Sequence, residues 1–353
     1  MALTVGLLGL THPHSAMYLR SLDLLEQVER VVAWDPDPVA RPRQHGRKTE
    51  RSYAGDGADG LEALLARRDV PVVLVALPND VTPGVVARAA AAGKDVICEK
   101  PGARSAAELR PALEALERNG RRMLMAYMWR ASPSILKLRQ LVRDGALGRL
   151  TSVELRMVTS QVRLRDPSHW LFKKEVAGGG VLAWLACHWL DALRYVTGDE
   201  VASAAALIGT VGGEAIDVED VAGAALRLRS GALVTLHAGY LLSTGQPGYE
   251  GADFDYPIVL RGTAGTLTHA REGAEQVVTL RSDAPGWQAA PRQVFRYTLP
   301  PSEAYGGVHG LQLFDRFLRG ETPLAGGEDA LRVLEILDAL YQSAASERTV
   351  HLT

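Results

Sequence analysis

The stretch ALPNDVTPGVVARAAAAGKDVICEKPG, Ala76–Gly102, contains the ends of two apolar strands with a helical segment between them. The first strand ends in Pro78 and Asn79, and the second ends in Glu99 and Lys100. Parallel strands of an α/β sheet bind their ligands at these carboxyl ends. A lysine there can donate to the oxygen of a reacting alcohol and stabilise alkoxide charge. The alternative to a catalytic role is that Glu99 and Lys100 form an ordinary ion pair on the surface.

The N-terminal part of the chain alternates short apolar strands with helical stretches. Because the strands are apolar almost throughout, we expect them to be buried on both faces of a parallel sheet. This pattern predicts an α/β fold with a doubly wound Rossmann domain over residues 1–125. The predicted strands span residues 2–9, 28–35, 70–78, 95–99 and 121–129.

The remaining residues, 126–353, have a different pattern. Strands with alternating polarity dominate from about Leu150, and a helical insert interrupts them around Val181 to Tyr195. We predict a C-terminal α+β domain with a large, mostly antiparallel sheet, one face of which is free to meet another subunit. The final helices, residues 304–346, are assigned to this second domain.

Composition narrows the class of protein. Of the 353 residues, 47% are apolar and 23% are charged, which is typical of a globular protein. The net charge is only −2, so the protein has no strong positive charge that would attract nucleic acid or an anionic membrane. Cys98 and Cys187 form no disulfide framework. No signal peptide is expected, because the first basic residue is Arg20, and no apolar run is expected to span a bilayer. We expect a soluble, cytoplasmic protein.

The opening loop departs from the G-x-G-x-x-G pattern that holds a dinucleotide. After Gly9, the second and third glycine positions are Thr11 and His14. Backbone amides and the following helix N-terminus can still form the anion site, and His12 or His14 can donate to a phosphate. Asp35, 26 residues after Gly9, can accept from ribose hydroxyls. From the loop alone, a strand–helix turn without a cofactor is equally compatible. We expect no metal at the two histidines, because no carboxylate or cysteine accompanies them locally.

Several motifs together resemble the Gfo/Idh/MocA family of pyridine-nucleotide oxidoreductases. They are the strand-end P-N, GKDVICEKP, and the glycine turn and helix GGGVLAWLACHWLD, Gly178–Asp191. The resemblance runs essentially end to end. It implies NAD(P) bound by a Rossmann domain, with Gly9, Thr11, His12, His14, Asp35, Pro78, Asn79, Glu99 and Lys100 as cofactor-site candidates. It also implies a homodimer or homotetramer formed through the C-terminal sheet.

The resemblance assigns catalytic roles to two residues. Lys100 corresponds to the lysine that contacts the reacting hydroxyl, and His188 to the histidine that acts as general acid/base in many members. Asp191 lies three residues further along the same helix, where it can orient the His188 ring or make a simple helix contact.

One position departs from the family pattern. The family's dehydrogenases usually have Asp four residues before the histidine, where this chain has Trp184. Trp170, Trp184 and Tyr240 are candidates to face the C–H surface of a sugar ring, although core packing accounts for each equally well. Arg130 and Lys174 are further candidates for contact with a substrate hydroxyl or carboxylate.

Cofactor choice depends on the segment after the second strand. Asp35 and the following Pro36 and Asp37 favour NAD over NADP, because a carboxylate repels a 2′-phosphate. The basic segment RPRQHGRKTER, Arg41–Arg51, is interpreted as a solvated helix face, with the 2′-phosphate of NADP as the alternative ligand.

The function predicted first is a dehydrogenase or reductase of a sugar, cyclitol or related polyol. The alternative is a lyase or glycosidase that oxidises its substrate transiently with bound NAD⁺, an option that the replacement of Asp by Trp184 makes more credible. A non-catalytic nucleotide-binding sensor comes third, because Lys100 and His188 are both retained.

Overall fold

The computed structural model describes residues 2–37, 46–55, 60–248 and 251–353. These residues form two compact units, which are described separately. Unit 1 comprises Met1–Ala131 and Pro300–Arg332. Unit 2 comprises Ser132–Leu299 and Val333–Thr353.

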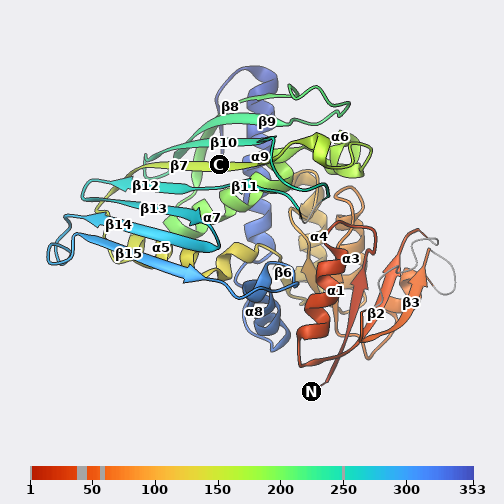
Figure 1. The fold of residues 1–353 in the computed structure, drawn as a ribbon. Coiled ribbons are helices and arrows are strands. Elements are labelled where there is room, and N and C mark those ends of the chain that lie inside the picture. Colours follow the sequence, from red (N-terminus) through yellow and green to blue (C-terminus); the bar gives the residue numbers. More distant parts are fainter. Residues whose placement is uncertain (1, 38–45, 56–59, 249–250) are drawn as a thin grey trace. The chain divides into compact units, whose positions relative to one another are not determined.

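Unit 1 contains a six-stranded sheet in the order β3-β2-β1-β4-β5-β6, in which every pair is parallel (Figure 1). This is the strand order of a dinucleotide-binding Rossmann fold. Residues of β1, β2, β4 and β5 are almost all buried, which explains their apolar sequences. The strands are β1 (Leu3–Leu8), β2 (Val28–Asp35), β3 (Thr49–Ala54), β4 (Val72–Val75), β5 (Asp95–Cys98) and β6 (Met123–Met125).

Helices pack around this sheet and begin at recognisable signals. Pro83 stands in the first turn of α3, and the Ser105 side chain accepts from the Glu108 amide at the start of α4. Helix α3 packs against α4, β4 and β5, and α1 packs against β2 and α8. The helices are α1 (Ser15–Leu24), α2 (Leu61–Leu65), α3 (Thr82–Ala91), α4 (Ala106–Arg118) and α8 (Gly307–Leu318).

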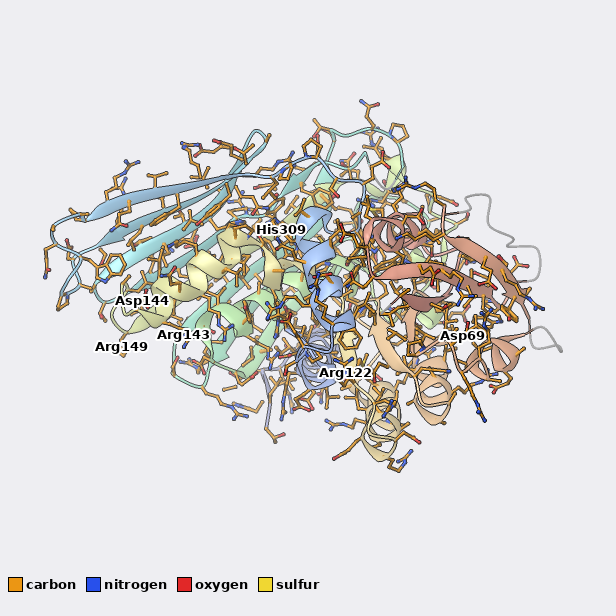
Figure 2. All side chains as sticks on the ribbon, turned by 90° about the horizontal axis from the view of Figure 1, so that it is seen from below. Asp69, Arg122, Arg143, Asp144, Arg149 and His309 are labelled. Carbon is orange, nitrogen blue, oxygen red and sulfur yellow. The ribbon has the colours of Figure 1, made fainter. Side chains whose placement is uncertain are left out.

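The division into units differs from the predicted domain boundary, because Pro300–Arg332 belongs to unit 1. Tyr305 and Phe314 lie in the same buried cluster as Tyr18 and the strands of the Rossmann sheet. The guanidinium of Arg122, labelled in Figure 2, stacks on the Phe317 ring at 4.6 Å and donates to the Phe317 carbonyl. The sequence shows that this segment is helical but does not show which core it joins.

The structure of the basic segment Arg41–Arg51 also differs from the helix face that the sequence predicted. Residues 38–45, which include Arg41 and Arg43, lie outside the described residues. The described part, from Gly46 onward, forms a turn and strand β3 and is not the face of a helix. The Lys48 ammonium donates to the carbonyl of Leu25, 2.7 Å away, and so closes the end of α1.

Unit 2 contains a ten-stranded sheet in the order β15-β14-β13-β12-β7-β10-β9-β8-β16, with β11 paired to β7. Among the described strands of unit 2, only the β7–β10 pair is parallel. The predicted mostly antiparallel sheet is therefore confirmed. Its strands are β7 (Leu150–Ser160), β8 (Val201–Gly209), β9 (Val221–Leu228), β10 (Leu233–Leu242), β11 (Phe254–Asp255), β12 (Ile258–Gly262), β13 (Gly265–Glu272), β14 (Glu275–Ser282), β15 (Arg292–Thr298) and β16 (Val350–His351).

In the part of unit 2 that the structure describes, helices cover one face of this sheet and no helix covers the other. Helix α5 (Pro133–Arg143) packs against β13, β14 and β15, and α7 (Cys187–Thr197) packs against β7 and α5 (Figure 1). Along β7 buried and exposed residues alternate, with Val153 and Leu155 buried and Glu154 and Arg156 exposed. Unit 2 also contains the short α6 (Lys174–Ala177) and the C-terminal part of α9 (Gly327–Ser346).

The segment Lys174–Thr197 corrects the expectation that no segment is long and apolar enough to cross a membrane. It has 24 residues, and its most apolar 18-residue window has a mean hydropathy of 1.3 and is 89% buried inside the protein. A helix that is covered on all sides by its own protein is apolar on all faces, as a membrane span is. The burial favours a core helix.

Candidate active site

The turn after β1 requires glycine at its first position. Gly9 has φ +106°, and a Cβ atom there would lie 2.0 Å from the carbonyl oxygen of Ala76. Only glycine allows β1 and the end of β4 to approach this closely. The strand order reverses at this pair, which makes it the switch point where Rossmann folds bind dinucleotides.

Asp35 ends β2 and holds the loop that follows Gly9. Its Oδ2 accepts from the Leu10 amide at 2.6 Å and from the Thr11 amide at 3.2 Å. Its Oδ1 accepts from the Asp37 amide at 2.9 Å. The carboxylate therefore fixes the loop, and its contact with a ribose stays a prediction.

The loop leads directly into helix α1, whose first turn contains no acidic residue. Ser15, the first residue of α1, donates its hydroxyl to the Gly9 carbonyl at 2.8 Å. The His14 amide donates to Nδ1 of His12 at 3.1 Å. A helix N-terminus whose own first turn contains no acidic residue suits the pyrophosphate of a dinucleotide, so these residues fit NAD.

Both histidine side chains of the loop are directed into the protein. His12 and His14 are each 4% exposed. Nδ1 of His14 lies 3.2 Å from Oε2 of Glu99, and the His14 ring packs against Tyr305 with 4.8 Å between centroids. The Tyr18 hydroxyl donates to the same carboxylate oxygen of Glu99. Donation by either histidine to a phosphate remains a prediction.

These contacts set the ionisation of the cluster. Burial opposes the charge on Glu99, but His14 and Lys100 outweigh it and hold the pKa of that carboxyl well below its usual range. Burial also lowers the pKa of His14, an effect that Glu99 partly opposes, and raises the pKa of Tyr18 well above its ordinary value. Glu99 is therefore an anion surrounded by donors.

Lys100 follows β5 and is fully buried. Its Nζ lies 3.7 Å from Oε1 of Glu99. Removal of an ammonium group from water costs free energy unless a counter-charge compensates for it. Glu99 and Lys100 are therefore not an ordinary surface pair but a buried ion pair at the ligand end of the sheet.

One cluster of side chains has the spacing of a metal site: His12, His14 and Glu99. One ligand atom from each lies within 4.8 Å of the others, and this is the one such group within the described residues. Sequence reasoning found no carboxylate beside the histidines, because Glu99 comes from a strand far along the chain. However, Nδ1 of His12 already accepts a hydrogen bond, and the Lys100 ammonium opposes a second cation. The expectation of no metal stays a prediction.

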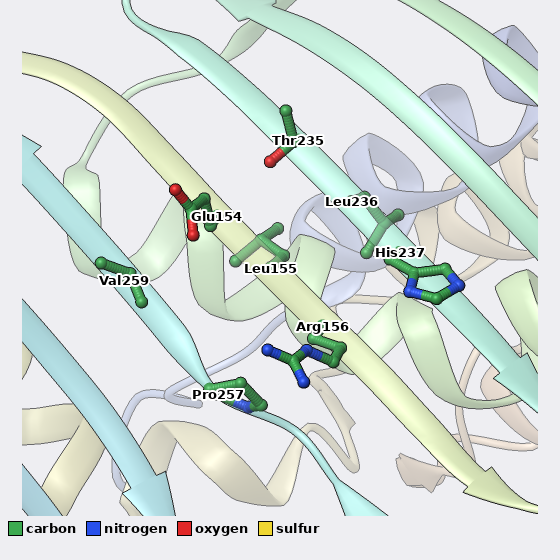
Figure 3. A pocket seen from close by; sticks show the side chains of 8 residues that line it. All are labelled: Glu154, Leu155, Arg156, Thr235, Leu236, His237, Pro257 and Val259. Carbon is green, nitrogen blue, oxygen red and sulfur yellow. The ribbon is translucent and has the colours of Figure 1, made fainter. Parts of the chain in front are cut away.

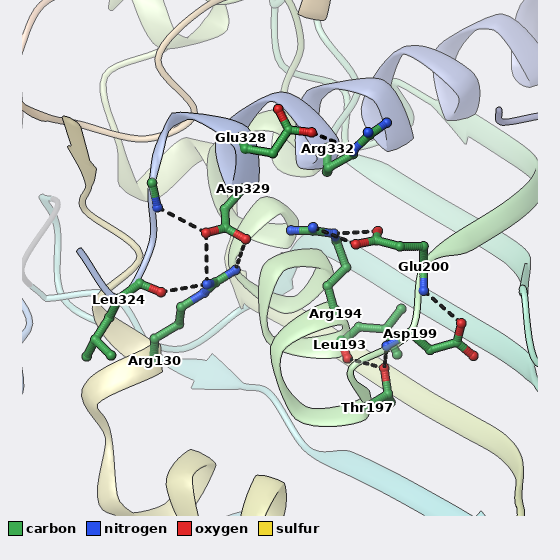
Figure 4. A network of polar contacts seen from close by, with 11 residues as sticks. Arg130, Leu193, Arg194, Thr197, Asp199, Glu200, Leu324, Glu328, Asp329 and Arg332 are labelled. Carbon is green, nitrogen blue, oxygen red and sulfur yellow. Dashed lines mark hydrogen bonds and ion pairs between the residues drawn. The ribbon is translucent and has the colours of Figure 1, made fainter. Parts of the chain in front are cut away.

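The remaining site residues predicted in unit 1 lie after β4 and near the C-terminal segment of the unit. Pro78 and Asn79 follow β4, where Asn79 is buried and the Pro78 carbonyl accepts from the Thr82 hydroxyl at the start of α3. The Arg130 guanidinium bonds with Asp329 at 2.8 Å and with the Leu324 carbonyl at 2.6 Å (Figure 4). Arg130 thus ties the C-terminal segment of unit 1 to its first part, and a role in substrate binding stays a prediction.

In unit 2, the glycine turn before the His188 helix packs against Glu219 and Tyr341. A Cβ atom on Gly180 would lie 2.0 Å from the Glu219 carbonyl oxygen, and one on Gly179 would lie 1.8 Å from the Tyr341 hydroxyl. The Glu219 carboxylate accepts from the amides of Gly180 and Leu182 at 2.8 and 2.9 Å. The glycines are needed because this carboxylate closes the start of the helix.

The predicted helix around Val181 to Tyr195 begins as a π-helix, Leu182–Ala186, and continues as α7. The Cys187 amide donates to the carbonyl of Leu182, five residues earlier. Such π-turns often occur at functional sites. The π-turn includes Trp184, and the first turn of α7 includes His188.

The residues predicted to contact substrate fall into separate groups in unit 2. Trp170 and Trp184 meet edge to face with 6.3 Å between ring centroids. His188 and Asp191 are buried on α7, and Lys174 is exposed. Tyr240 belongs to another group, in which it packs on Phe172 at 5.7 Å beneath the Arg165 guanidinium.

Sequence reasoning missed Tyr18, Tyr305, Glu219 and Tyr341, which surround these groups. Tyr18 had a local signal, since it lies one helical turn after His14 on the buried face of α1. The other three come from distant segments, and no local pattern indicates them.

Sequence profiles match both parts of this arrangement. A profile described as an oxidoreductase family with an NAD-binding Rossmann fold matches residues 3–127, and a Gfo/Idh/MocA C-terminal domain profile matches residues 135–268. The chain belongs to the Gfo/Idh/MocA family. The predicted family, its NAD cofactor and its oxidoreductase class are therefore confirmed.

Relatives in the Gfo/Idh/MocA family include sugar and cyclitol enzymes. Levoglucosan dehydrogenase of Pseudarthrobacter phenanthrenivorans is 28% identical, over 92% of this chain and 89% of that protein. Inositol 2-dehydrogenase of Rhizobium meliloti is 27% identical, over 83% and 84%. A solved structure of levoglucosan dehydrogenase with NADH and L-sorbose has the same fold, with a TM-score of 0.81, 24% identity and 100% coverage of both chains.

Proposed function

We propose that this protein is an NAD-dependent dehydrogenase that oxidises a secondary alcohol of a neutral sugar, cyclitol or related polyol. The observation that carries the proposal is the fully buried Lys100 at the end of β5. A buried ammonium at the carboxyl end of a Rossmann sheet is costly for a purely structural role. The family relatives named for levoglucosan and inositol support a polyhydroxylated ring as the substrate.

The chain's own residues would manage the substrate hydroxyl. Bound NAD⁺ supplies the acceptor for the hydride that leaves the carbinol carbon. Lys100 would donate from Nζ to the reacting oxygen and stabilise the negative charge that develops there. His188 would remove the hydroxyl proton as the general base. In reduction the same groups return the proton.

The Trp170–Trp184 pair supports a sugar substrate with little charge. Trp184 is 2% exposed and occupies the position where the family's dehydrogenases usually have a carboxylate. Indole rings present apolar faces that suit the C–H faces of a pyranose or cyclitol. The same replacement favours the second candidate, a lyase or glycosidase that recycles bound NAD⁺.

A cofactor and substrate screen tests the function. The protein is incubated with NAD⁺ or NADP⁺ and levoglucosan, myo-inositol or common aldoses, and both NAD(P)H absorbance and substrate consumption are followed. The dehydrogenase accumulates free NADH in step with its product. Substrate loss without free NADH would indicate redox recycling, and no substrate loss with tight NADH binding would indicate a sensor.

Cofactor preference is proposed to favour NAD(H). Asp35 ends β2, and its charge opposes a 2′-phosphate. Asp35→Ser should lower kcat/KM for NAD⁺ by about tenfold and reduce the discrimination against NADP⁺. A wild-type preference for NADPH would contradict this proposal and would direct attention to Arg47.

Assembly through the open face of the unit 2 sheet is also proposed. Leu207 and Leu233 are 80% and 50% exposed on β8 and β10. Between β7, β10 and β12 the same sheet has a shallow pocket lined by Leu155, Leu236, Val259, Pro257, Glu154, Arg156, Thr235 and His237 (Figure 3). A second copy would cover the exposed side chains of Leu207 and Leu233.

Light scattering tests the assembly. The wild-type protein should have the mass of a dimer or tetramer, and Leu207→Glu should reduce it toward that of the 38.0 kDa chain. A monomeric wild type would exclude this interface. A cytoplasmic location is proposed with it, and cell fractionation tests that.

A further inference from the structure

His14 occupies the position where dinucleotide loops usually have their third glycine, and its side chain lies beneath the loop. The side chain is almost completely buried, with Nδ1 3.2 Å from the Glu99 carboxylate and the ring against Tyr305. The loop therefore contacts the end of β5 through a side chain that glycine does not have. This contact lies wholly within unit 1.

Glu99 connects helix α1 to Lys100. One carboxylate oxygen, Oε2, faces His14 and the Tyr18 hydroxyl, and the other, Oε1, faces the Lys100 ammonium. The Tyr18 ring itself packs on Tyr305 with 4.6 Å between centroids. The contacts therefore run without a gap from the cofactor loop to the ammonium group.

We propose that His14 is a positioning residue that, through Glu99, fixes the orientation of the Lys100 ammonium. The proposal rests on the function proposed for Lys100. A buried carboxylate remains anionic only while donors and a cation compensate for its burial. Without His14, the Oε2 atom of Glu99 would lose a contact that holds the carboxylate in place, and the Lys100 side chain would be fixed less firmly against Oε1.

Other titratable groups face this cluster and enter its electrostatics. His12 lies on the loop side, where its ring acts electrostatically on Glu99. Cys98 precedes Glu99 and has a pKa raised by burial, and Tyr305 faces His14 and Tyr18. A test of His14 must therefore separate its donor nitrogen from the space that its ring fills.

Two variants of the full-length protein make that separation. His14→Asn places an amide nitrogen near the position of Nδ1, whereas His14→Leu fills similar volume without a donor. We expect His14→Leu to lower kcat by about tenfold or more while Kd for NADH changes less than about threefold, and His14→Asn to recover most of the lost kcat. Tyr18→Phe, which removes the other donor, should lower kcat in the same direction.

The same variants are compared by a measurement that needs no turnover. The protein is labelled with carbon-13 lysine, and the Lys100 signal is assigned by its loss in Lys100→Arg. With one donor to Glu99 removed, the carboxylate charge is less compensated, so Lys100 should keep its proton to a higher pH in His14→Leu and Tyr18→Phe than in the wild type, and His14→Asn should restore the titration.

The outcomes separate this inference from the proposed function. A wild type that oxidises no sugar would contradict the function, and the lysine titration would still test the coupling. If His14→Leu and Tyr18→Phe both leave the Lys100 titration unchanged, the inference is wrong. If His14→Asn is as impaired as His14→Leu, the ring and not its donor matters, and the inference is equally wrong.

Discussion

Glu99 in unit 1 and Glu219 in unit 2 are both buried carboxylates that accept from a tyrosine hydroxyl, yet their pKa values move in opposite directions. Tyr18 donates to Glu99, and Tyr341 donates to Glu219 at 3.0 Å. His14 and Lys100 overcome the effect of burial and lower the pKa of Glu99. At Glu219, burial outweighs the amides of Gly180 and Leu182 and raises the pKa.

The opposite pKa shifts distinguish a carboxylate in a chemical site from one with a structural role. Glu99 faces a cation that a reaction can use, whereas Glu219 faces backbone amides at the start of the π-helix. Loss of the Glu99 partner should therefore change turnover, and disruption around Glu219 should change stability. The predictions below test these two expectations, beginning with the largest effect.

Lys100→Ala should lower kcat by about two to four orders of magnitude, because it removes the donor to the reacting oxygen. Kd for NADH should change much less, since the loop and Asp35 are untouched. Steady-state kinetics and NADH fluorescence measure the two quantities. Near-normal turnover would mean that the Glu99–Lys100 pair has only a structural role, as Glu219 does.

Gly180→Ala should reduce the free energy of unfolding by about 3 kcal/mol or more, because its Cβ would overlap backbone atoms of Glu219. The control is Gly223→Ala on β9, where an added Cβ meets no atom within 4 Å. Chemical denaturation compares the two variants. Equal stability of both would show that the turn does not depend on the fit against Glu219.

His269 extends the comparison to a buried group whose pKa is shifted by desolvation alone. Burial lowers the pKa of His269 to about 4, and the ring packs against Trp189 and Tyr256. As pH falls below about 6.5, the unfolded chain takes up a proton that the folded chain resists, so stability is lost until the pH approaches the folded pKa.

His269→Phe should remove this dependence. Between about pH 7 and pH 5 the wild type should lose about 2 kcal/mol more unfolding free energy than the variant. His237→Phe, at an exposed position of β10, serves as the control and should follow the wild type. Parallel curves for wild type and His269→Phe would mean that the imidazole is solvated in the folded protein.

Trp184→Asp should move the acid limb of the kcat/KM profile for oxidation upward by about half to two pH units. A carboxylate one turn before His188 would favour the imidazolium, whereas an indole offers one donor and no acceptor. His188→Ala should abolish the limb in both backgrounds. A limb that does not move, or that survives loss of His188, would exclude His188 as the base.

Much of the fold could be predicted because its signals are local. Apolar strands indicated the parallel sheet, and the strand ends placed Asp35, Asn79, Glu99 and Lys100 at one edge. The π-turn at Leu182–Ala186 could not be predicted, because its bonding depends on Glu219 and Tyr341 from distant segments. The assignment of Pro300–Arg332 to unit 1 depends likewise on Tyr305 and Phe317, which meet their partners only in the folded chain.

The candidate active site could likewise be predicted only where its signals are local. The residue types at Gly9, Lys100 and His188 suggested their chemistry, but the direction of the His14 side chain follows from Glu99, 85 residues further along the chain. The sequence suggested a loop histidine near phosphate. The structure shows a buried contact with the residue that neighbours the proposed catalytic lysine.

The most direct test of the central claim follows the hydride itself. A polyol that the screen identifies as a substrate is deuterated at its carbinol carbon and incubated with NAD⁺, and the free NADH is analysed by mass spectrometry. The account predicts free NADH that carries one deuterium atom for each molecule of ketone formed. Deuterium that stays on the sugar skeleton while substrate is consumed, with unlabelled or no free NADH, would contradict it.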